Sequence, residues 1–159
     1  MIPICSRKGR SRGPLPEARG TSLMEFLLSI MTVMFVLFWM WEGTMVVYTY
    51  SVLSDSAKEG VRYAMVHGPG NSNCSGPAPS TSSACPDPSA DNVAAVVKDY
   101  AGYSFHNLSA MQVAVSYPDS TNAASNRVRV VVNYDFVPYI KLPWNPPHLK
   151  AVADGRVVN

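Results

Sequence analysis

The chain has few of the residues, and none of the motifs, on which enzyme chemistry usually depends. Its three histidines, His67, His106 and His148, stand far apart in the sequence. No H-E-x-x-H, G-x-S-x-G or phosphate-binding glycine loop is present. The sequence therefore predicts no enzyme activity and no catalytic residue, and we expect each histidine at the surface or at a helix end.

Cysteine is also scarce, with Cys5, Cys74 and Cys85 as the three examples. Structural zinc sites need closely spaced pairs of cysteine or histidine ligands. Here ten residues separate Cys74 from Cys85, and no second pair has ligand spacing. We therefore expect no metal and no cofactor.

Acidic residues are nearly missing from the start of the chain. Residues 1–20 hold five basic residues and one acidic residue, a formal charge of +4, whereas the rest has eight basic and ten acidic residues. A basic tail can bind nucleic acid. Here the basic run stops where an apolar run begins, which favours a flank that stays in the cytoplasm beside a membrane segment. We expect no nucleic-acid partner.

A long apolar run follows the basic leader. Residues 26–41 contain only Ser29 and Thr32 as polar residues, and as a helix they would extend about 24 Å. Continuing to Tyr50 reaches the ~30 Å of a hydrocarbon core. We therefore expect a transmembrane helix over residues 21–50. A cleavable secretory signal, which has a shorter apolar core, and a generic single-pass anchor are the alternatives.

The two acidic residues of this run differ in their surroundings. Glu25 opens the run, where a carboxylate is costly unless it is protonated or meets a cation. Glu42 follows Trp39 and Trp41, which are typical of the aromatic belt at a membrane interface. We expect Glu42 at that interface.

Beyond the membrane the helical pattern continues with a period of 3.6 residues. Leu53, Ala57 and Val61 lie on one face, and Glu59 and Arg62 are spaced to pair. Residues 67–70, His-Gly-Pro-Gly, cannot continue a helix. One helix is therefore predicted from about Ser22 to Val66.

Residues 68–88 are rich in glycine, proline, serine and asparagine and predict a loop. Cys74 and Cys85 bracket most of it. In an oxidising compartment outside the membrane, they are expected to form a disulfide. In the chain-entropy model such a closure stabilises by roughly 3 kcal/mol.

The remaining chain predicts an α+β domain over residues 51–159. Asp87 as N-cap and Pro88 at the first helical position predict a second helix, which Gly102 ends. Alternating apolar residues over 111–117 and 128–136 predict an antiparallel pair of strands with one buried face. A third short strand is expected near residues 150–158.

Residues 20–26, Gly-Thr-Ser-Leu-Met-Glu-Phe, resemble the processing site of type IV prepilins. The resemblance implies that a prepilin peptidase cuts between Gly20 and Thr21, which removes residues 1–20 as a leader. It also implies an assembly role for Glu25 and Phe26, in which the Glu25 carboxylate pairs with the new amine of Thr21 on a neighbouring subunit.

The segment 57–64, Ala-Lys-Glu-Gly-Val-Arg-Tyr-Ala, is similar to a helix common in TadE-like proteins, minor pilins or pseudopilins of the tight-adherence (Flp) pilus. The resemblance implies a pilin-like domain on a single-pass inner-membrane helix, with the N-terminus cytoplasmic and the C-terminal domain periplasmic or extracellular. The implied partners are other pilins and the pilus assembly platform, and the implied process is cell adhesion. A pseudopilin of a type II secretion system and an unprocessed, membrane-anchored periplasmic binding domain are the alternatives.

Overall fold

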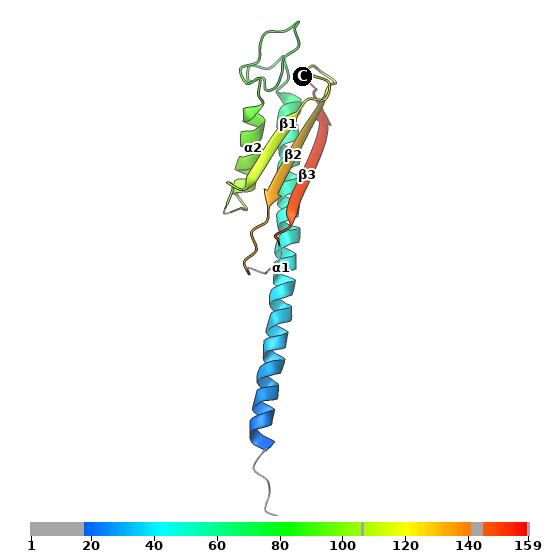
Figure 1. Ribbon diagram of the computed structural model, residues 1–159. Helices are drawn as coiled ribbons and strands as arrows, with labels where there is room; N and C mark the ends of the chain where they lie inside the picture. The colour runs from blue at the N-terminus through cyan, green and yellow to red at the C-terminus, as the bar shows by residue number, and fades with distance from the viewer. Residues whose placement is uncertain (1–17, 106, 141–144, 159) are drawn as a thin grey trace, which may run out of the picture. The chain divides into compact units, whose positions relative to one another are not determined.

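The computed structural model describes residues 18–105, 107–140 and 145–158, with side chains from Ser22 onward. The elements follow in the order α1 (Ala18–Val66), α2 (Asp91–Gly102), β1 (Met111–Ser116), β2 (Arg127–Asp135) and β3 (His148–Arg156) (Figure 1). The chain divides into one compact unit that ends at Met40 and a second that begins at Trp41. The expected α+β class, with a long apolar N-terminal helix, a second helix and an antiparallel sheet, is confirmed.

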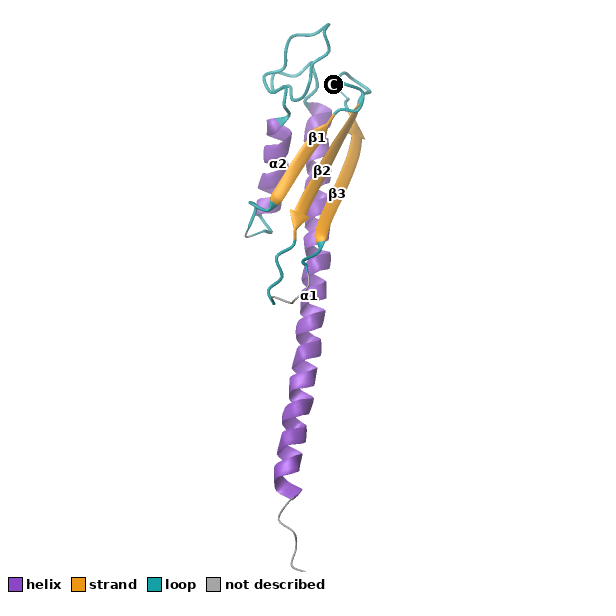
Figure 2. Cartoon of the chain, viewed as in Figure 1, coloured by secondary structure: helices purple, strands orange, loops and turns teal. Residues whose placement is uncertain are grey.

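The described part of the first unit is helical throughout. Helix α1 is the long purple helix of Figure 2. It begins at Ala18, four residues before the expected start at Ser22, and therefore includes Gly20 and Thr21 in its backbone. Residues 1–17, most of the predicted leader, lie outside the described residues.

The second unit contains a three-stranded sheet in the order β1-β2-β3. Strand β2 pairs antiparallel with β1, where Val113 faces Val132, and antiparallel with β3, where Val132 faces Ala151. Burial alternates along β2, as period-2 geometry requires when one face of a sheet is covered. The predicted third strand is confirmed, although it begins at His148 rather than at Lys150.

Helix α2 and the last turns of α1 cover the buried face of the sheet. Gly60 lies where α1, α2 and β2 meet, because a Cβ atom there would run into Val97 of α2, with Val93 and Val130 close by. The shared core is made of small and branched apolar side chains: Leu53, Ala57, Val61, Ala64, Ala90, Val93, Val97, Ala101, Met111, Val128, Val130, Val132, Tyr134 and Ala151.

The predicted start of the second helix is wrong. Asp87 is not the N-cap and Pro88 is not the first helical residue, because Ala90 adopts a left-handed conformation, with φ of 62°, directly before α2. A helix cannot run through a left-handed residue. Asp87 nevertheless satisfies the helix start from outside, since its carboxylate accepts hydrogen bonds from the backbone N–H groups of Asp91 and Asn92 at 2.9 and 2.8 Å.

Candidate functional site

The first candidate site is the apolar stretch of α1 between Leu23 and Trp41. Its described large apolar side chains are 44% to 73% exposed, on every side of the helix. The helix is long and apolar enough to cross a membrane, with a mean hydropathy of 2.1 in its most apolar window. A helix that is apolar all round is favoured in an apolar surrounding, and this one is long enough to cross a hydrocarbon core.

Two polar side chains on this stretch, those of Thr32 and Glu25, differ in whether the helix itself satisfies them. Thr32 donates its hydroxyl to the carbonyl of Leu28 at 2.9 Å, so this group needs no outside partner. Glu25 and Phe26 are both exposed, and within the described part of the chain no hydrogen bond or ion pair satisfies the Glu25 carboxylate. Glu25 is therefore the acidic group of this stretch that calls for a partner from outside the described chain.

The predicted cleavage site lies at the edge of what the structure describes. Gly20 and Thr21 belong to the backbone of α1, but the side chain of Thr21 falls outside what the structure describes. Cleavage and the pairing of Glu25 with a Thr21 amine stay predictions.

The second candidate site is the loop that follows α1. Cys74 and Cys85 form the expected disulfide, with their Cα atoms 5.0 Å apart. Beside it Asn122 is fully buried, and its side-chain NH₂ donates to the carbonyl of Ser75 at 3.1 Å. The hydroxyl of Tyr117 donates to the same carbonyl at 3.1 Å. Burial, and secondarily the charge of Asp87, raise the pKa of Tyr117 to about 12, so this hydroxyl stays a donor at neutral pH.

Asp87 connects this loop to α2. It is 8% exposed, and its carboxylate accepts a hydrogen bond from the Ser75 hydroxyl at 2.6 Å in addition to the two from α2. Burial raises the pKa of Asp87, but the hydrogen bonds, first that from Ser75 and then those from backbone N–H groups, together lower it below its ordinary value of 3.8. Asp87 is therefore charged at neutral pH and holds the disulfide loop on the positive end of a helix.

Glu42 makes a contact that the sequence did not predict. Its Oε1 accepts a hydrogen bond at 3.1 Å from the backbone N–H of Tyr139, which lies between β2 and β3. Its Oε2 is buried, with no hydrogen-bond partner in the described residues. The carboxylate thus joins α1 to a connection 97 residues further along the chain.

The two described histidines lie in different places, and the ring of each contacts a different neighbour. His67 stacks on Tyr63 with ring centroids 3.8 Å apart, and His148 pairs with Asp135. His106 lies outside the described residues. In the part of the chain that the structure describes, no three histidine, cysteine, aspartate or glutamate residues are placed to hold a metal ion.

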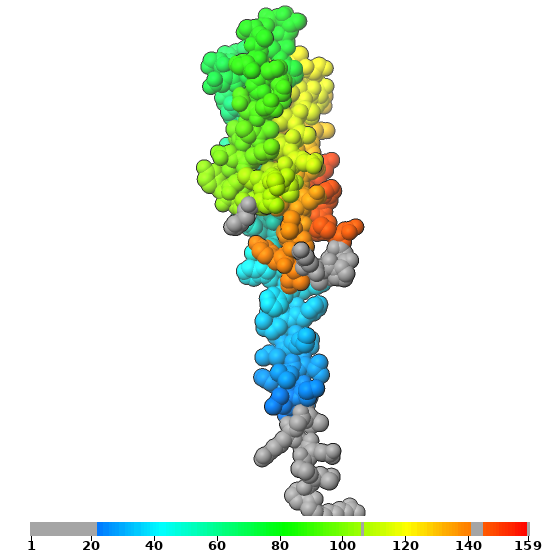
Figure 3. Space-filling view, turned by 60° about the vertical axis from the view of Figure 1, so that its left-hand side comes forward, coloured from blue at the N-terminus to red at the C-terminus, as the bar shows by residue number. Residues whose placement is uncertain are grey.

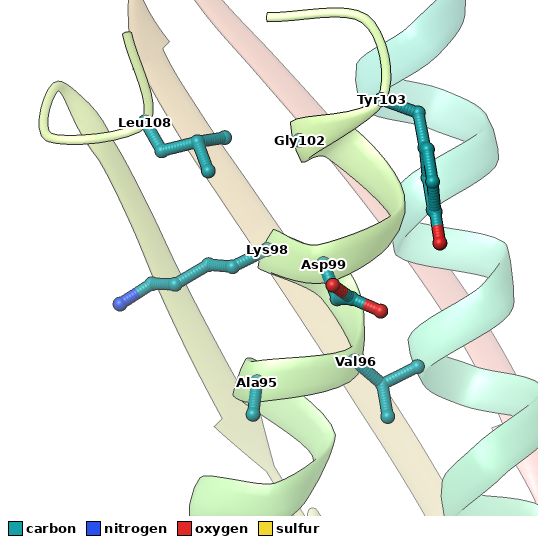
Figure 4. Close-up of a pocket in the computed structure, with 7 residues that line it drawn as sticks. All are labelled: Ala95, Val96, Lys98, Asp99, Gly102, Tyr103 and Leu108. Carbon is teal, nitrogen blue, oxygen red and sulfur yellow. The ribbon is translucent and has the colours of Figure 1, made fainter.

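A shallow hollow lies on the outer side of α2 (Figure 4). Lys98 and Asp99 project from it in different directions, and Tyr103 lies apart from both. A binding pocket for a small molecule normally has a few polar groups that converge on one point. This hollow has no such convergence and gives no support to a catalytic or cofactor role.

No protein-family model, no curated protein and no solved structure matches this chain. Its own residues and their geometry therefore carry any assignment of function.

Proposed function

We propose that this chain is a TadE-like minor pilin or pseudopilin that takes part in the assembly of a tight-adherence pilus. The observation that carries the proposal is the sequence Gly20, four residues, Glu25 and Phe26 at the start of a helix that is apolar on every side. A building block of this kind needs a processing site, a segment that can move between membrane and filament, and a folded head domain.

The apolar stretch of α1 is the assembly element in this proposal. Its side chains are exposed in the single chain, and in a filament they pack against the same stretch of neighbouring subunits. Packing apolar helices together excludes water as completely as lipid does, so transfer from membrane to filament costs little hydrophobic free energy.

Glu25 gives the assembly its register. A carboxylate in an apolar surrounding is unfavourable until it meets a cation. Cleavage after Gly20 creates such a cation, the α-amine of Thr21, one helical turn away on the same chain and equally available on a neighbour. Pairing across subunits satisfies both charges only in one axial position, and this selects one stagger between chains.

The proposed partners follow from these roles. They are a prepilin peptidase, other pilins or pseudopilins and the assembly platform in the inner membrane. Before assembly the chain spans that membrane once, with its N-terminus in the cytoplasm and residues 51–159 in the periplasm or outside the cell.

Intact-mass analysis of the chain, produced with and without a tight-adherence prepilin peptidase, tests the processing step. We expect loss of residues 1–20 and a new N-terminus at Thr21. Gly20→Leu should leave the full-length precursor, whereas the matched leader variant Gly9→Leu should still be cut. A wild-type chain that keeps its full mass beside an active peptidase would favour the unprocessed, membrane-anchored binding domain instead.

Glu25→Gln tests the pairing step, because it keeps the shape of the side chain and removes its charge. We expect normal cleavage and membrane abundance but reduced co-purification with partner pilins. Asp55→Asn, an acid-to-amide change at an exposed position further along α1, should leave assembly unchanged. Assembly of Glu25→Gln at the wild-type level would refute the pairing mechanism, and co-purification with type II secretion components would favour that alternative system.

A further inference from the structure

The connection between β2 and β3 carries an apolar surface that the fold does not use. Residues 136–140, here called the β2–β3 foot, have no charged member, and Val137, Tyr139 and Ile140 are exposed. By contrast, the outer face of the sheet pairs Arg129 with Asp154, as expected of a surface in water. The foot is therefore unlike the aqueous surface of the same domain.

The foot is held in a fixed place beside α1. Phe136 is buried, and its N–H donates to the carbonyl of Pro147 at 3.3 Å. The N–H of Tyr139 donates to Glu42 of α1. Figure 1 shows this connection running below the sheet alongside α1, and Figure 3 shows its orange atoms against the cyan part of that helix.

Glu42 fixes the level of the foot with respect to the apolar run. It is the first charged residue after residues 26–41, and the next charge along α1 is Asp55. Sequence alone therefore allows hydrocarbon to end either near Glu42 or as far along as Tyr50. The contact with Tyr139 decides between them, because irregular backbone exposed to lipid cannot satisfy its peptide groups inside a hydrocarbon core.

We propose that the β2–β3 foot is a second membrane contact, which lies in the headgroup region at the level of Glu42. The foot contacts the lipid surface. Val137 and Ile140 reach the top of the acyl chains. Tyr139 offers an apolar ring with a polar hydroxyl, which suits the membrane interface. The contact sets the end of the span at Glu42, which belongs to the same compact unit as the foot. It rests on the membrane anchoring in the proposed function.

Spin labels on single cysteines test the depth of the foot in vesicles of phosphatidylethanolamine and phosphatidylglycerol. The full chain carries Cys5→Ser and keeps the Cys74–Cys85 disulfide. Val137→Cys is compared with Val158→Cys, since the two valines are 60% and 70% exposed. The N–H of Val158 bonds to Met65 of α1, about 35 Å along the helix from Glu42 at 1.5 Å per residue. For each label we compare the accessibility to molecular oxygen, which dissolves in lipid, with the accessibility to a water-soluble nickel complex. We expect the ratio of the first to the second to be several-fold higher at position 137 than at position 158.

Two further labels separate the ways in which the inference can fail. Leu37→Cys should be lipid-exposed, and a water-exposed label there would refute the anchoring and, with it, the foot. Tyr50→Cys should be water-exposed, and a lipid-exposed label would place Glu42 inside the hydrocarbon and overturn the proposed level. With Leu37 in lipid, a label at Val137 that matches Val158, or that is shielded from both reagents by a protein contact, refutes the foot and leaves the pilin proposal standing.

Discussion

Two stretches of α1 differ in how their apolar side chains are covered. Between Leu23 and Trp41 they are exposed all round the helix, whereas Leu53, Ala57 and Ala64 are fully buried against the sheet and α2. The difference follows from spacing, because the first stretch has almost no polar residues and the second has one apolar stripe at a period of 3.6. One helix thus serves two surroundings, and substitutions matched between the stretches can separate them.

The largest effect is expected from truncating a buried leucine. Leu53→Ala should lower the free energy of unfolding of the second unit by about 2–5 kcal/mol, because it removes apolar contacts and leaves a cavity. Leu27→Ala, in the exposed stretch, should leave that unfolding nearly unchanged. Thermal unfolding in detergent micelles, followed by the β-sheet signal in circular dichroism, measures both. Equal losses would mean that the two stretches share one core.

Loss of the disulfide should have the second-largest effect on stability. Replacing Cys74 and Cys85 together by serine should cost about 3 kcal/mol, the loop-closure entropy of a short cross-linked segment. Cys5→Ser, which removes a cysteine outside this loop, should cost nothing. Unfolding in urea with and without reductant checks this, and reduced wild type should match the double variant. Free labelling of both thiols in unreduced protein would show that the bond does not form.

Alanine substitutions at two glycines of α1 should have smaller effects on stability, and the two effects should differ in sign or size. Gly60→Ala should destabilise by about 1–3 kcal/mol, since its methyl group enters the packed space beside Val97. Gly43 has nothing within 4 Å of its Cβ position. Gly43→Ala should therefore be neutral or stabilise by about 0.5–1 kcal/mol through backbone entropy. Melting temperatures of the pair give the comparison, and a destabilised Gly43→Ala would reveal close packing at that level.

The smallest effect concerns Asp87 and depends on pH. Asp87→Ala should cost about 0.5–2 kcal/mol at pH 7, as expected for loss of a helix cap, whereas Asp99→Ala on the exposed side of α2 should not. The pKa of Asp87 is lowered from 3.8 in the folded protein, so its contribution is complete above that value. It is lost as pH falls through the folded pKa.

The pH dependence of unfolding checks this sign. The difference between wild type and Asp87→Ala should shrink as pH falls below about 4. Asp119, whose pKa is lowered to about 2 by hydrogen bonds with Arg127, is present in both proteins, so its own pH dependence cancels in this difference. A difference that grows towards acidic pH would contradict the assignment.

Local patterns predicted most of the elements of this fold. The alternation in β1 and β2 placed their buried faces correctly, and the break after Val66 placed the end of α1. The pair of Glu59 and Arg62 also formed, at 3.2 Å. These features depend on residues a few positions apart, so periodicity and turn chemistry suffice to find them.

The start of α2 shows where local reasoning fails. Asp and Pro in sequence are typical of a helix start, yet the chain turns through Ala90 first. Asp87 is held away from the N-cap position by a contact with a residue distant in the sequence. It lies beside Ser75 in a short parallel bridge and accepts a hydrogen bond from the Ser75 hydroxyl. Asp87 therefore caps the helix from four residues away instead of from the position next to it.

The sequence alone determined the division of this protein into an apolar helix and an α+β domain, because composition and periodicity decide which side chains must leave water. It also singled out Glu25 as an acid at the start of an apolar run, and it predicted the disulfide between Cys74 and Cys85. The tertiary structure decided which distant groups meet, namely Asp87 with Ser75 and Glu42 with Tyr139. Such contacts depend on how the β2–β3 connection and the disulfide loop return to the helices, and no local pattern encodes that return.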